Sequence, residues 1–411
     1  MKITFLGGAR EVGRSAILVN DRLLLDYGIK NDTPLSYPVD QVSPDAVVVS
    51  HGHLDHAGAV PALCSGDNRP SIHLTPPTGR LTTELAQDTL KLHGGTYNCP
   101  FTEVDVKRVT QLLTRHSYGE TFTAADHQIT FYDAGHIPGS AHLLVDDGDT
   151  RLFYTGDFAV ESQCLVDGST ARPDADVVIS ESTYADTTRK SRTTIESEFI
   201  EFVQQRLWAG GTVVVPAFAI GRTQEVISLL ADANIGCYLD GMGQRISRLF
   251  CDYPDFLDTS SLRAATRHAR FVNGQDGQRA RIANQNTVIV TTAGMLQGGP
   301  AMTYIPEIAS NPANAIALTG YQVEGSPGRE LLESGRLPME RQTIPVSARV
   351  RQFDLSAHAD RNDLLSFLQP YSEKKILLNH GDRATDFASG LQSDGFDAVA
   401  PETGETVFIE P

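Results

Sequence analysis

The chain has 411 residues and carries 34 Lys and Arg against 51 Asp and Glu, which gives a formal net charge of −17. Its length indicates two domains or one large α/β unit, and its 40% hydrophobic residues exclude a disordered chain. The apolar runs are too short for a membrane-spanning helix, and the first residues do not resemble an export signal, so we expect a cytoplasmic protein. The five Cys are scattered and form no C-x-x-C pair, which argues against a disulfide framework and against a cysteine zinc site.

Short strands dominate the first half of the chain. Apolar, β-branched runs bounded by turn residues predict strands at residues 3–6, 16–19, 23–25, 46–49, 129–131, 142–145, 152–154 and 177–179. Helical patterns occur at residues 80–91 and 103–113, with a short one after His56. Because many strands follow one another without an intervening helix, an α/β sandwich of two sheets fits better than a doubly wound sheet.

From about Tyr184 the order changes to alternating helices and strands. The pattern predicts a helix, a strand, a second helix and a second strand at residues 194–208, 212–215, 223–231 and 236–239. This alternation is typical of a parallel α/β layer. The tail returns to short strands at 376–378 and 407–409, with a helix at 361–369. We therefore expect a first domain, residues 1–185 and 346–411, interrupted by an inserted domain at 186–345.

The clearest chemical signal is SHGHLDHAG at residues 50–58, directly after the strand predicted at 46–49. Burying three imidazoles and a carboxylate without partners would cost several kcal/mol. Imidazole and carboxylate are good zinc ligands. His51 and His53 can reach one metal ion, while Asp55 and His56 can reach a second. The segment therefore predicts a metal site on a loop at the carboxyl end of a strand, rather than a solvated turn.

One segment cannot complete two metal sites, so further ligands should stand at other strand ends. Three candidates follow predicted strands and lie beside glycine, namely His136, Asp157 and His380. Glycine lets backbones approach closely at such junctions. Each residue alone would more often be a surface or capping residue. Together, and in this order, they favour a centre with two metal ions.

The pattern H-x-H-x-D-H, followed by G-H and then G-D, resembles the metallo-β-lactamase superfamily. That resemblance implies an α/β fold, an αββα sandwich with a dinuclear zinc site. Glu181 in SESTY, His358 in FDLSAHAD and His380 resemble the three additional motifs of the β-CASP branch. Membership of that branch implies an α/β β-CASP cap inserted into the sandwich, in agreement with the change of pattern near Tyr184.

Further segments extend the resemblance over nearly the whole chain. They lie at residues 215–222, 240–242, 292–300 and 320–328. The opening LGGAREVGRS at residues 6–15 is similar to archaeal homologues of the cleavage and polyadenylation specificity factor endonuclease. Because the chain starts at the first predicted strand, the resemblance implies the short archaeal form without KH-type RNA-binding domains.

The resemblance implies a role for each ligand position. One zinc ion would be bound by His51, His53 and His136, the other by Asp55, His56 and His380, and Asp157 would bridge the two. Asp26 would orient a ligand histidine, and both Asp26 and Asp55 are assigned to the catalytic set as well. Two zinc ions about 3.5–4 Å apart can activate water and neutralise a phosphate.

Hydrolysis of a phosphodiester also requires a proton for the leaving 3′ oxygen. By the resemblance, His358 would be the general acid and Glu181 would fix its orientation, a contribution of about 100- to 10,000-fold. Substrate contacts would come from Arg222, Ser326 and Arg329 in glycine-rich cap segments. The alternative is that both arginines pair with the many carboxylates of the chain.

The implied function is zinc-dependent hydrolysis of single-stranded RNA, by an endonuclease in RNA processing or 3′-end maturation. A 5′ to 3′ exoribonuclease of the RNase J type is the main alternative. A silent scaffold is disfavoured because every ligand position is filled, and a small-molecule hydrolase is disfavoured by Glu181, His358 and the cap. We also expect a homodimer, with residues 403–411 as a candidate edge strand, and association with an RNA-processing complex.

The acidity of the chain is uneven in composition, with 32 Asp against 19 Glu and 7 Lys against 27 Arg. Short carboxylates and few lysines suit a surface hydrated at very high salt, so we expect a halophilic, archaeal source. Drift from Lys to Arg in a GC-rich genome is the alternative. At molar salt the Debye length is about 3 Å. A net charge of −17 therefore does not exclude an RNA substrate.

Overall fold

The computed structural model describes residues 1–32, 34–96, 98–275 and 277–410, and its contacts divide the chain into two compact units. The first, here called the sandwich, contains Met1–Ser162, Asp167–Thr188 and Ala357–Pro411. The second, here called the cap, contains Gln163–Val166 and Arg189–Ser356. The limits of the inserted domain, residues 186 and 345, stay predictions. Strand β19 (Arg349–Gln352) pairs with a strand of the cap.

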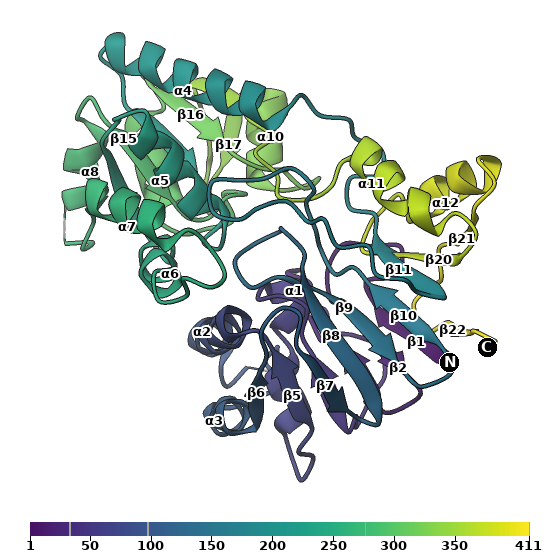
Figure 1. Ribbon diagram of the computed structural model, residues 1–411. Helices are drawn as coiled ribbons and strands as arrows, with labels where there is room; N and C mark the ends of the chain where they lie inside the picture. Colours follow the sequence, from purple (N-terminus) through teal and green to yellow (C-terminus); the bar gives the residue numbers. More distant parts are fainter. Residues whose placement is uncertain (33, 97, 276, 411) are drawn as a thin grey trace. The chain divides into compact units, whose positions relative to one another are not determined.

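Two β-sheets form the centre of the sandwich (Figure 1). The first has the order β22 (Thr406–Phe408), β1 (Lys2–Gly7), β2 (Ala16–Val19), β3 (Leu23–Leu25), β4 (Ala46–Val48), β5 (Ser71–Leu74), β6 (Leu113–Arg115). The second has the order β21 (Asp397–Val399), β20 (Lys375–Asn379), β11 (Val177–Glu181), β10 (Arg151–Tyr154), β9 (Ala141–Asp146), β8 (His127–Asp133), β7 (Thr121–Ala124). The two ends of the chain meet here, where the Met1 amino group donates to the Ile409 carbonyl at 2.7 Å.

Alternation along the strands separates an inner core from two outer ones. In β3, Leu23 and Leu25 are buried between the two sheets, whereas Leu24 packs on the outer face of the first sheet. In β10, Tyr154 lies in the inner core and Phe153 on the outer face of the second sheet. Successive side chains of a strand point to opposite faces, so each sheet has one face for its partner sheet and one for helices. The predicted αββα sandwich is confirmed.

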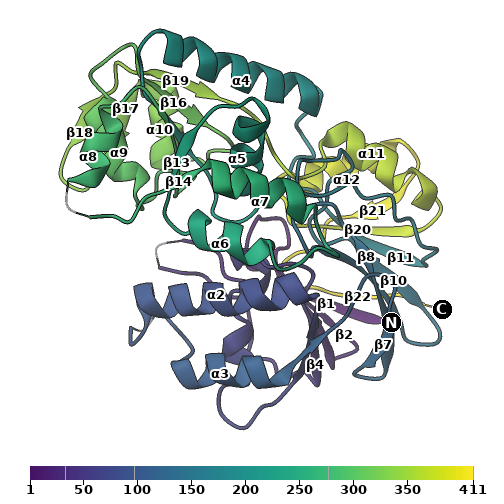
Figure 2. The same cartoon turned by 60° about the vertical axis from the view of Figure 1, so that its left-hand side comes forward.

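Helices cover both outer faces of the sandwich. On the first sheet lie α1 (Leu54–Ala57), the 3-10 helix η1 (Val60–Cys64), α2 (Pro76–His93) and α3 (Glu103–Leu112); on the second lie α11 (Arg361–Leu368), the 3-10 helix η2 (Gln369–Tyr371) and α12 (Ala384–Ser393). Figure 2 shows α2 and α3 side by side. Capping boxes begin α3, through Thr102 and Asp105, and α11, through Asp360 and Asp363. These side chains satisfy backbone N–H groups that would otherwise lack partners.

The cap is a parallel α/β layer, as the alternating pattern predicted. Its sheet has the order β14 (Arg270–Phe271), β13 (Cys237–Asp240), β15 (Val288–Thr291), β12 (Val213–Pro216), β16 (Ala315–Leu318), β19, and neighbouring strands are parallel. One face contacts α4 (Arg192–Trp208), α5 (Arg222–Asp232) and α6 (Gly243–Phe250). The other face packs in one core with α8 (Gln278–Ala283), α9 (Ala301–Ile308) and α10 (Pro327–Ser334). The remaining elements are α7 (Thr259–His268), β17 (Arg336–Pro338) and β18 (Thr343–Pro345).

Several local features test the sequence predictions. Strands β5, β6 and β7 were not expected, and residue 113, predicted as helix, instead begins β6. All five cysteines are free. Among the described residues, no helix combines the length and apolar character needed to cross a bilayer. Strand β22 does lie at the edge of its sheet, beside β1, and Pro411, the last residue of the predicted edge strand, lies outside the described residues.

Candidate metal centre

Four strand ends of the sandwich bring the predicted ligands together. His51 and His53 follow β4, His136 follows β8, Asp157 follows β10 and His380 follows β20. One potential ligand atom from each of His51, His53, His136 and Asp157 falls within 4.8 Å of the others, and the same holds for Asp55, His56 and His380. The two groups coincide with the two ligand sets that the resemblance implied.

The first group has the spacing expected around a metal ion. His53 Nδ1 lies 3.1 Å from His51 Nε2 and 3.1 Å from His136 Nε2. Nitrogens bound tetrahedrally at the usual zinc–nitrogen distance are about 3.3 Å apart. The ring planes of the three residues are nearly perpendicular in pairs, at 82° to 84°. Three imidazoles that aim nitrogens at one point therefore fit a zinc ion.

Asp157 lies between the two groups and is almost completely buried. Its Oδ2 atom is 3.6 Å from His51 Nε2 and 3.3 Å from His56 Nε2. Its Oδ1 atom is 3.1 Å from His380 Nδ1. In the second group, His380 Nε2 lies 3.2 Å from Asp55 Oδ2. One carboxylate thus contacts histidines of both groups, as a ligand shared by two metal ions must.

The histidines of the first group are kept neutral by their surroundings. Burial holds the pKa values of His51 and His136 well below the ordinary value, and it lowers the pKa of His53 to about 4. A neutral imidazole is the form that binds metal. The first group therefore needs no proton loss near neutral pH before it can bind.

The second group contains carboxylates that reverse this shift. Burial alone would lower the pKa of His56, but Asp157 and Asp26 outweigh it and raise that pKa well above the ordinary value. The pKa of His380 is also raised, because Asp157 and Asp55 outweigh burial. Burial would raise the pKa values of Asp55 and Asp157, yet the histidines they face, His56 and His380, lower both. Positive charge at this point is therefore stabilised by the protein.

Asp26 orients a histidine of the second group. Its Oδ2 atom accepts a hydrogen bond from His56 Nδ1 at 2.7 Å. Three further hydrogen bonds hold the carboxylate, from the Ser50 backbone N–H at 2.7 Å, the Ser50 hydroxyl at 2.7 Å and the Tyr154 hydroxyl at 2.8 Å. A carboxylate fixed in this way sets the tautomer of His56 and directs Nε2 towards Asp157.

Backbone conformation at two of these residues is unusual. Asp26 and His380 have φ values of 57° and 49°, in the left-handed region that residues other than glycine rarely adopt. Gly28 is required for a different reason, because a Cβ atom there would lie 1.8 Å from the Asp55 carbonyl oxygen. Uncommon backbone conformations at polar residues concentrate at functional sites. These uncommon backbone conformations bring the polar side chains of the centre together.

His358 and Glu181 form a pair beside the ligand groups. His358 Nδ1 lies 3.0 Å from Glu181 Oε2, and the Phe158 N–H donates to Glu181 Oε1 at 2.7 Å. The rings of His358 and His136 have centroids 4.5 Å apart. His136 Nδ1 also donates to the Ala357 carbonyl at 2.7 Å. The loop that carries His358 therefore also orients a ligand of the first group.

The three residues predicted to contact substrate lie in the cap. Arg222 begins α5 and is buried, and Ser326 is buried and caps α10 by accepting from the Arg329 N–H at 3.2 Å. Arg329 forms an exposed ion pair with Glu333 at 2.5 Å. Carboxylate pairing, the alternative left open for the arginines, describes Arg329. Contact of all three residues with substrate stays a prediction.

Sequence reasoning missed the side chains that support the ligands. Ser50 and Tyr154 hold Asp26, and Thr183 lies 3.1 Å from His380 Nδ1 through its hydroxyl. Ser50 stands directly before the histidine motif and Tyr154 three residues before Asp157. A polar residue at the end of a buried strand was the available signal. It did not reveal the partner, because Tyr154 and Asp26 are 128 positions apart.

Three family models match consecutive parts of the chain. Residues 9–189 match the metallo-β-lactamase superfamily, residues 223–331 match the Beta-Casp domain, and residues 343–401 match the Zn-dependent metallo-hydrolase RNA specificity domain. A crystal structure of a protein of unknown function from Enterococcus faecalis shares the fold, with a TM-score of 0.63 at 12% identity, over 99% of both chains.

Curated relatives align with the chain over its full length. It is 34% identical to the "Probable RNase MJ4" of Methanocaldococcus jannaschii, over 100% of both proteins. It is 34% identical to the "RNase aCSPSF2" of Saccharolobus solfataricus, over 99% of this chain and 85% of the relative. It is 32% identical to the "Transcription termination factor FttA" of Methanothermobacter thermautotrophicus, over 100% of this chain and 72% of the relative. The chain therefore belongs to the β-CASP branch of the metallo-β-lactamase superfamily, and it is a hydrolytic nuclease of a metal-using family.

Proposed function

We propose that this chain is a dinuclear zinc ribonuclease that cleaves single-stranded RNA internally. The observation that carries the proposal is the hydrogen-bonded pair of His358 and Glu181 beside two ligand groups whose histidines both contact Asp157. A ligand centre without such a pair would suit many hydrolases, whereas phosphodiester cleavage also needs a proton donor for the leaving oxygen. RNA is the proposed substrate because two of the relatives are named as RNases.

The residues that would hold the two zinc ions form the two groups described above. The first would use His51, His53 and His136, the second Asp55, His56 and His380, and Asp157 would serve both. Bound there, zinc ions supply Lewis acidity that makes water a nucleophile near neutral pH and neutralises charge on the phosphate.

His358 is the proposed proton donor to the leaving 3′ oxygen. Its Nδ1 atom is engaged by Glu181, so Nε2 is the ring nitrogen from which the proton passes. Glu181 in turn is held by the Phe158 N–H and fixes the orientation of the ring. Asp26 acts on the other side of the centre, where it keeps His56 in one tautomer.

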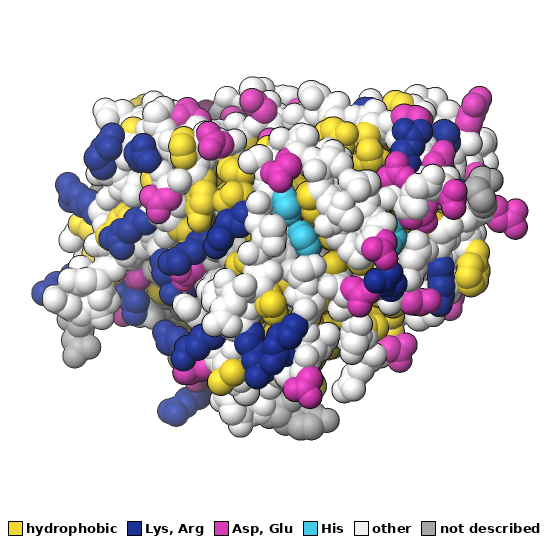
Figure 3. Space-filling view, turned by 60° about the horizontal axis from the view of Figure 1, so that its bottom comes forward, with side chains coloured by type: hydrophobic (Ala, Val, Ile, Leu, Met, Phe, Trp, Pro, Cys, Tyr) yellow, Lys and Arg dark blue, Asp and Glu magenta, His cyan; other side chains and the backbone are white. Residues whose placement is uncertain are grey.

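The net charge of −17 does not oppose this substrate. Figure 3 shows groups of neighbouring Lys and Arg side chains among scattered Asp and Glu side chains. Positive charge is therefore concentrated locally rather than spread evenly. Where salt screens the net charge, such local groups of Lys and Arg can still contact RNA phosphates at short range.

Cleavage of end-labelled RNA tests the proposal. The purified protein in molar KCl with zinc is given RNA labelled at the 5′ end that carries either a monophosphate or a triphosphate. Internal fragments from both RNAs are expected. No product from RNA would contradict the proposed function, and the His358→Ala protein in parallel shows whether a product derives from this centre.

A 5′ to 3′ exoribonuclease is the second candidate, because the same residues and chemistry would serve it. The same assay separates the two. Mononucleotides from the monophosphate RNA alone would replace the endonuclease by the exonuclease, and would leave the proposed roles of the ligands and of His358 unchanged.

A further inference from the structure

An aromatic ring stands exposed at the carboxyl edge of the cap sheet. Phe218 follows β12 by two residues and is 37% exposed. Tyr321 and Val323 follow β16, the parallel neighbour of β12, and are 48% and 45% exposed. Burying such a side chain is worth about 1.5–3 kcal/mol. Three large apolar residues at adjacent strand ends therefore forgo a stabilisation that other residues of this sheet obtain.

The ring of Phe218 lies on glycine backbone. A Cβ atom added to Gly320 would lie 3.0 Å from Phe218 Cε2, and one added to Gly294 would lie 3.3 Å from Phe218 Cδ2. A side chain at Gly320 would crowd the ring, and one at Gly294 would crowd both the ring and the Phe218 backbone nitrogen, which is 3.0 Å from the added Cβ atom. The ring thus packs against two glycines from two loops.

Hydrogen bonds make this support rigid. The buried Gln322 amide donates to the carbonyls of both Gly294 and Gly320, at 3.2 Å and 3.1 Å. The Phe218 carbonyl accepts from the Thr223 N–H at 3.0 Å and from the Thr223 hydroxyl at 2.7 Å. Because both the ring's own backbone and the glycines beneath it are fixed, little entropy remains to be lost when a ligand packs on the ring.

We propose that Phe218, together with Tyr321 at the end of the neighbouring strand, is a platform on which bases of the RNA substrate stack. The inference rests on the proposed function, since RNA supplies the bases. A rigid, exposed aromatic ring suits stacking, which tolerates any sequence because every base has a π-face. The location also fits, because ligands of parallel α/β sheets bind outside the carboxyl ends of the strands.

A protein partner fits this patch less well. A stable protein interface buries about 800 Å² on each partner, and the exposed apolar side chains here are three, Phe218, Tyr321 and Val323. The glycine support acts on one ring only, through Gly294 and Gly320. Single flat ligands need such a support, whereas a broad apolar contact does not.

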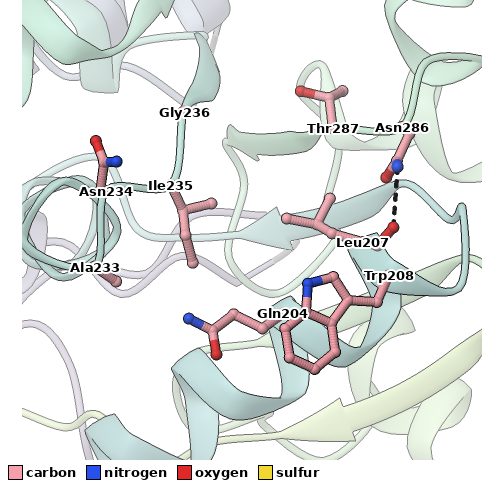
Figure 4. A pocket seen from close by; sticks show the side chains of 9 residues that line it. All are labelled: Gln204, Leu207, Trp208, Ala233, Asn234, Ile235, Gly236, Asn286 and Thr287. Carbon is pink, nitrogen blue, oxygen red and sulfur yellow. Dashed lines mark hydrogen bonds between the residues drawn. The ribbon is translucent and has the colours of Figure 1, made fainter.

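The opposite edge of the same sheet offers a matched control. Trp208, at the end of α4, is 85% exposed and is the only Trp of the chain. It lines a hollow of about 410 Å³ with Gln204 and Ile235, near the amino ends of the strands (Figure 4). A Cβ atom on Gly236, which also lines the hollow, would meet nothing within 4 Å. This exposed aromatic therefore lacks the glycine support and lies at the edge where ligands of such sheets do not bind.

Steady-state cleavage of a short single-stranded RNA by the zinc-loaded enzyme tests the platform. Phe218→Leu is expected to raise KM about 5- to 100-fold, the loss of one stacked base, with kcat changed less than twofold, since stacking on a base that does not itself react contributes equally before and during the reaction. Phe218→Tyr keeps an aromatic ring and should have the wild-type KM. Trp208→Leu should leave both constants unchanged.

A second measurement separates stacking from a structural effect. In a His358→Ala background, fluorescence anisotropy compares binding of the RNA with binding of an oligomer of the same length that lacks bases. Phe218→Leu should weaken binding of the RNA and leave binding of the oligomer without bases unchanged. Far-ultraviolet circular dichroism should show that the Phe218→Leu protein is folded.

Two results would overturn the platform while leaving the nuclease intact. These are a wild-type KM in Phe218→Leu, which would favour a protein as the occupant of the patch, and equal weakening for strands with and without bases. A wild-type enzyme that cleaves no RNA would instead contradict the proposed function itself.

Discussion

The sandwich and the cap use the same position in a sheet for opposite purposes. In the sandwich, strand ends carry buried His and Asp side chains, such as His51 and Asp157, whose polar atoms face one another. In the cap, strand ends carry glycine and an exposed ring, Phe218. Buried polar atoms need strong partners, whereas an exposed aromatic ring held in place offers a face to a flat ligand. The first arrangement is suited to chemistry and the second to binding.

The difference also shows in what holds each region in place. The sandwich centre depends on side-chain hydrogen bonds, for example those from Ser50 and Tyr154 to Asp26. The cap edge depends on hydrogen bonds to the backbone carbonyls of Gly294 and Gly320. Substitutions in the sandwich should therefore affect metal content and the rate of the chemical step, whereas those at the cap edge should affect KM.

The largest effect is expected for Asp157→Ala. Loss of the carboxylate that contacts both histidine groups should remove metal. The resulting fall in kcat should exceed about 10,000-fold, the upper end of the range for loss of one proton donor. Mass spectrometry of the native protein gives the metal content. Asp149→Ala, on an exposed turn of the same unit, is the control. Unchanged zinc in Asp157→Ala would contradict the assigned ligand.

His358→Ala should slow cleavage by about 100- to 10,000-fold while both metal ions are retained. His358 is the proposed proton donor and stands outside the ligand groups around His51 and His56. It does lie with Asp157 and Glu181 in a further group of potential ligand atoms within 4.8 Å of one another. His268→Ala, at an exposed position at the end of α7, should behave as wild type. Loss of zinc in His358→Ala would make this residue a ligand and end its assignment as proton donor.

A smaller effect is expected for Asp26→Asn. The amide keeps the shape of the carboxylate but stabilises His56 Nδ1–H less, so metal affinity should fall about 10- to 100-fold. Titration with a competing chelator measures it. Activity should return at high zinc concentration, which separates this variant from Asp157→Ala. Wild-type affinity would show that the 2.7 Å contact between Asp26 and His56 does not orient the ligand.

The smallest effect on activity is expected for a buried histidine outside the centre. His142 Nδ1 donates to the Thr155 carbonyl at 2.8 Å and Nε2 lies 2.7 Å from the Ser169 hydroxyl. Burial lowers the pKa of His142 to about 3. Because the unfolded chain takes up a proton near the ordinary pKa of 6.5 and the folded protein does not, stability should fall as the pH drops below that value, by up to about 1.4 kcal/mol per pH unit.

His142→Gln should flatten this slope. Urea unfolding of both proteins in EDTA, at several pH values between 7.5 and 4.5, measures the difference without a contribution from bound metal. Equal slopes would show that His142 does not remain neutral in the folded protein.

Sequence patterns reveal the ligands of the centre better than the residues that support them. The histidine run at 51–56 and its distant partners stand at ends of strands that local apolar runs already predict. Tyr154 and Ser50 were missed because their roles depend on contacts with Asp26 that no local pattern contains. Leu113, the first residue of β6, was taken for the end of a helix because the pairing of β6 with β5 is a contact between distant segments.

The exposed ring of the cap illustrates the same limit. Phe218 stands in an apolar run directly after a buried strand, where a sequence pattern predicts burial. The ring is instead 37% exposed and packs against two glycines, Gly294 and Gly320, which lie 76 and 102 positions further along the chain. Segments that only the folded cap brings together thus determine whether the ring is covered.

Anomalous X-ray diffraction at the zinc edge, on crystals of the protein prepared with zinc, tests the central claim most directly. Two peaks are expected on either side of the Asp157 carboxylate, one beside His51, His53 and His136 and the other beside Asp55, His56 and His380. A single peak, or two peaks that do not share Asp157, would contradict a dinuclear centre assembled from these strand ends.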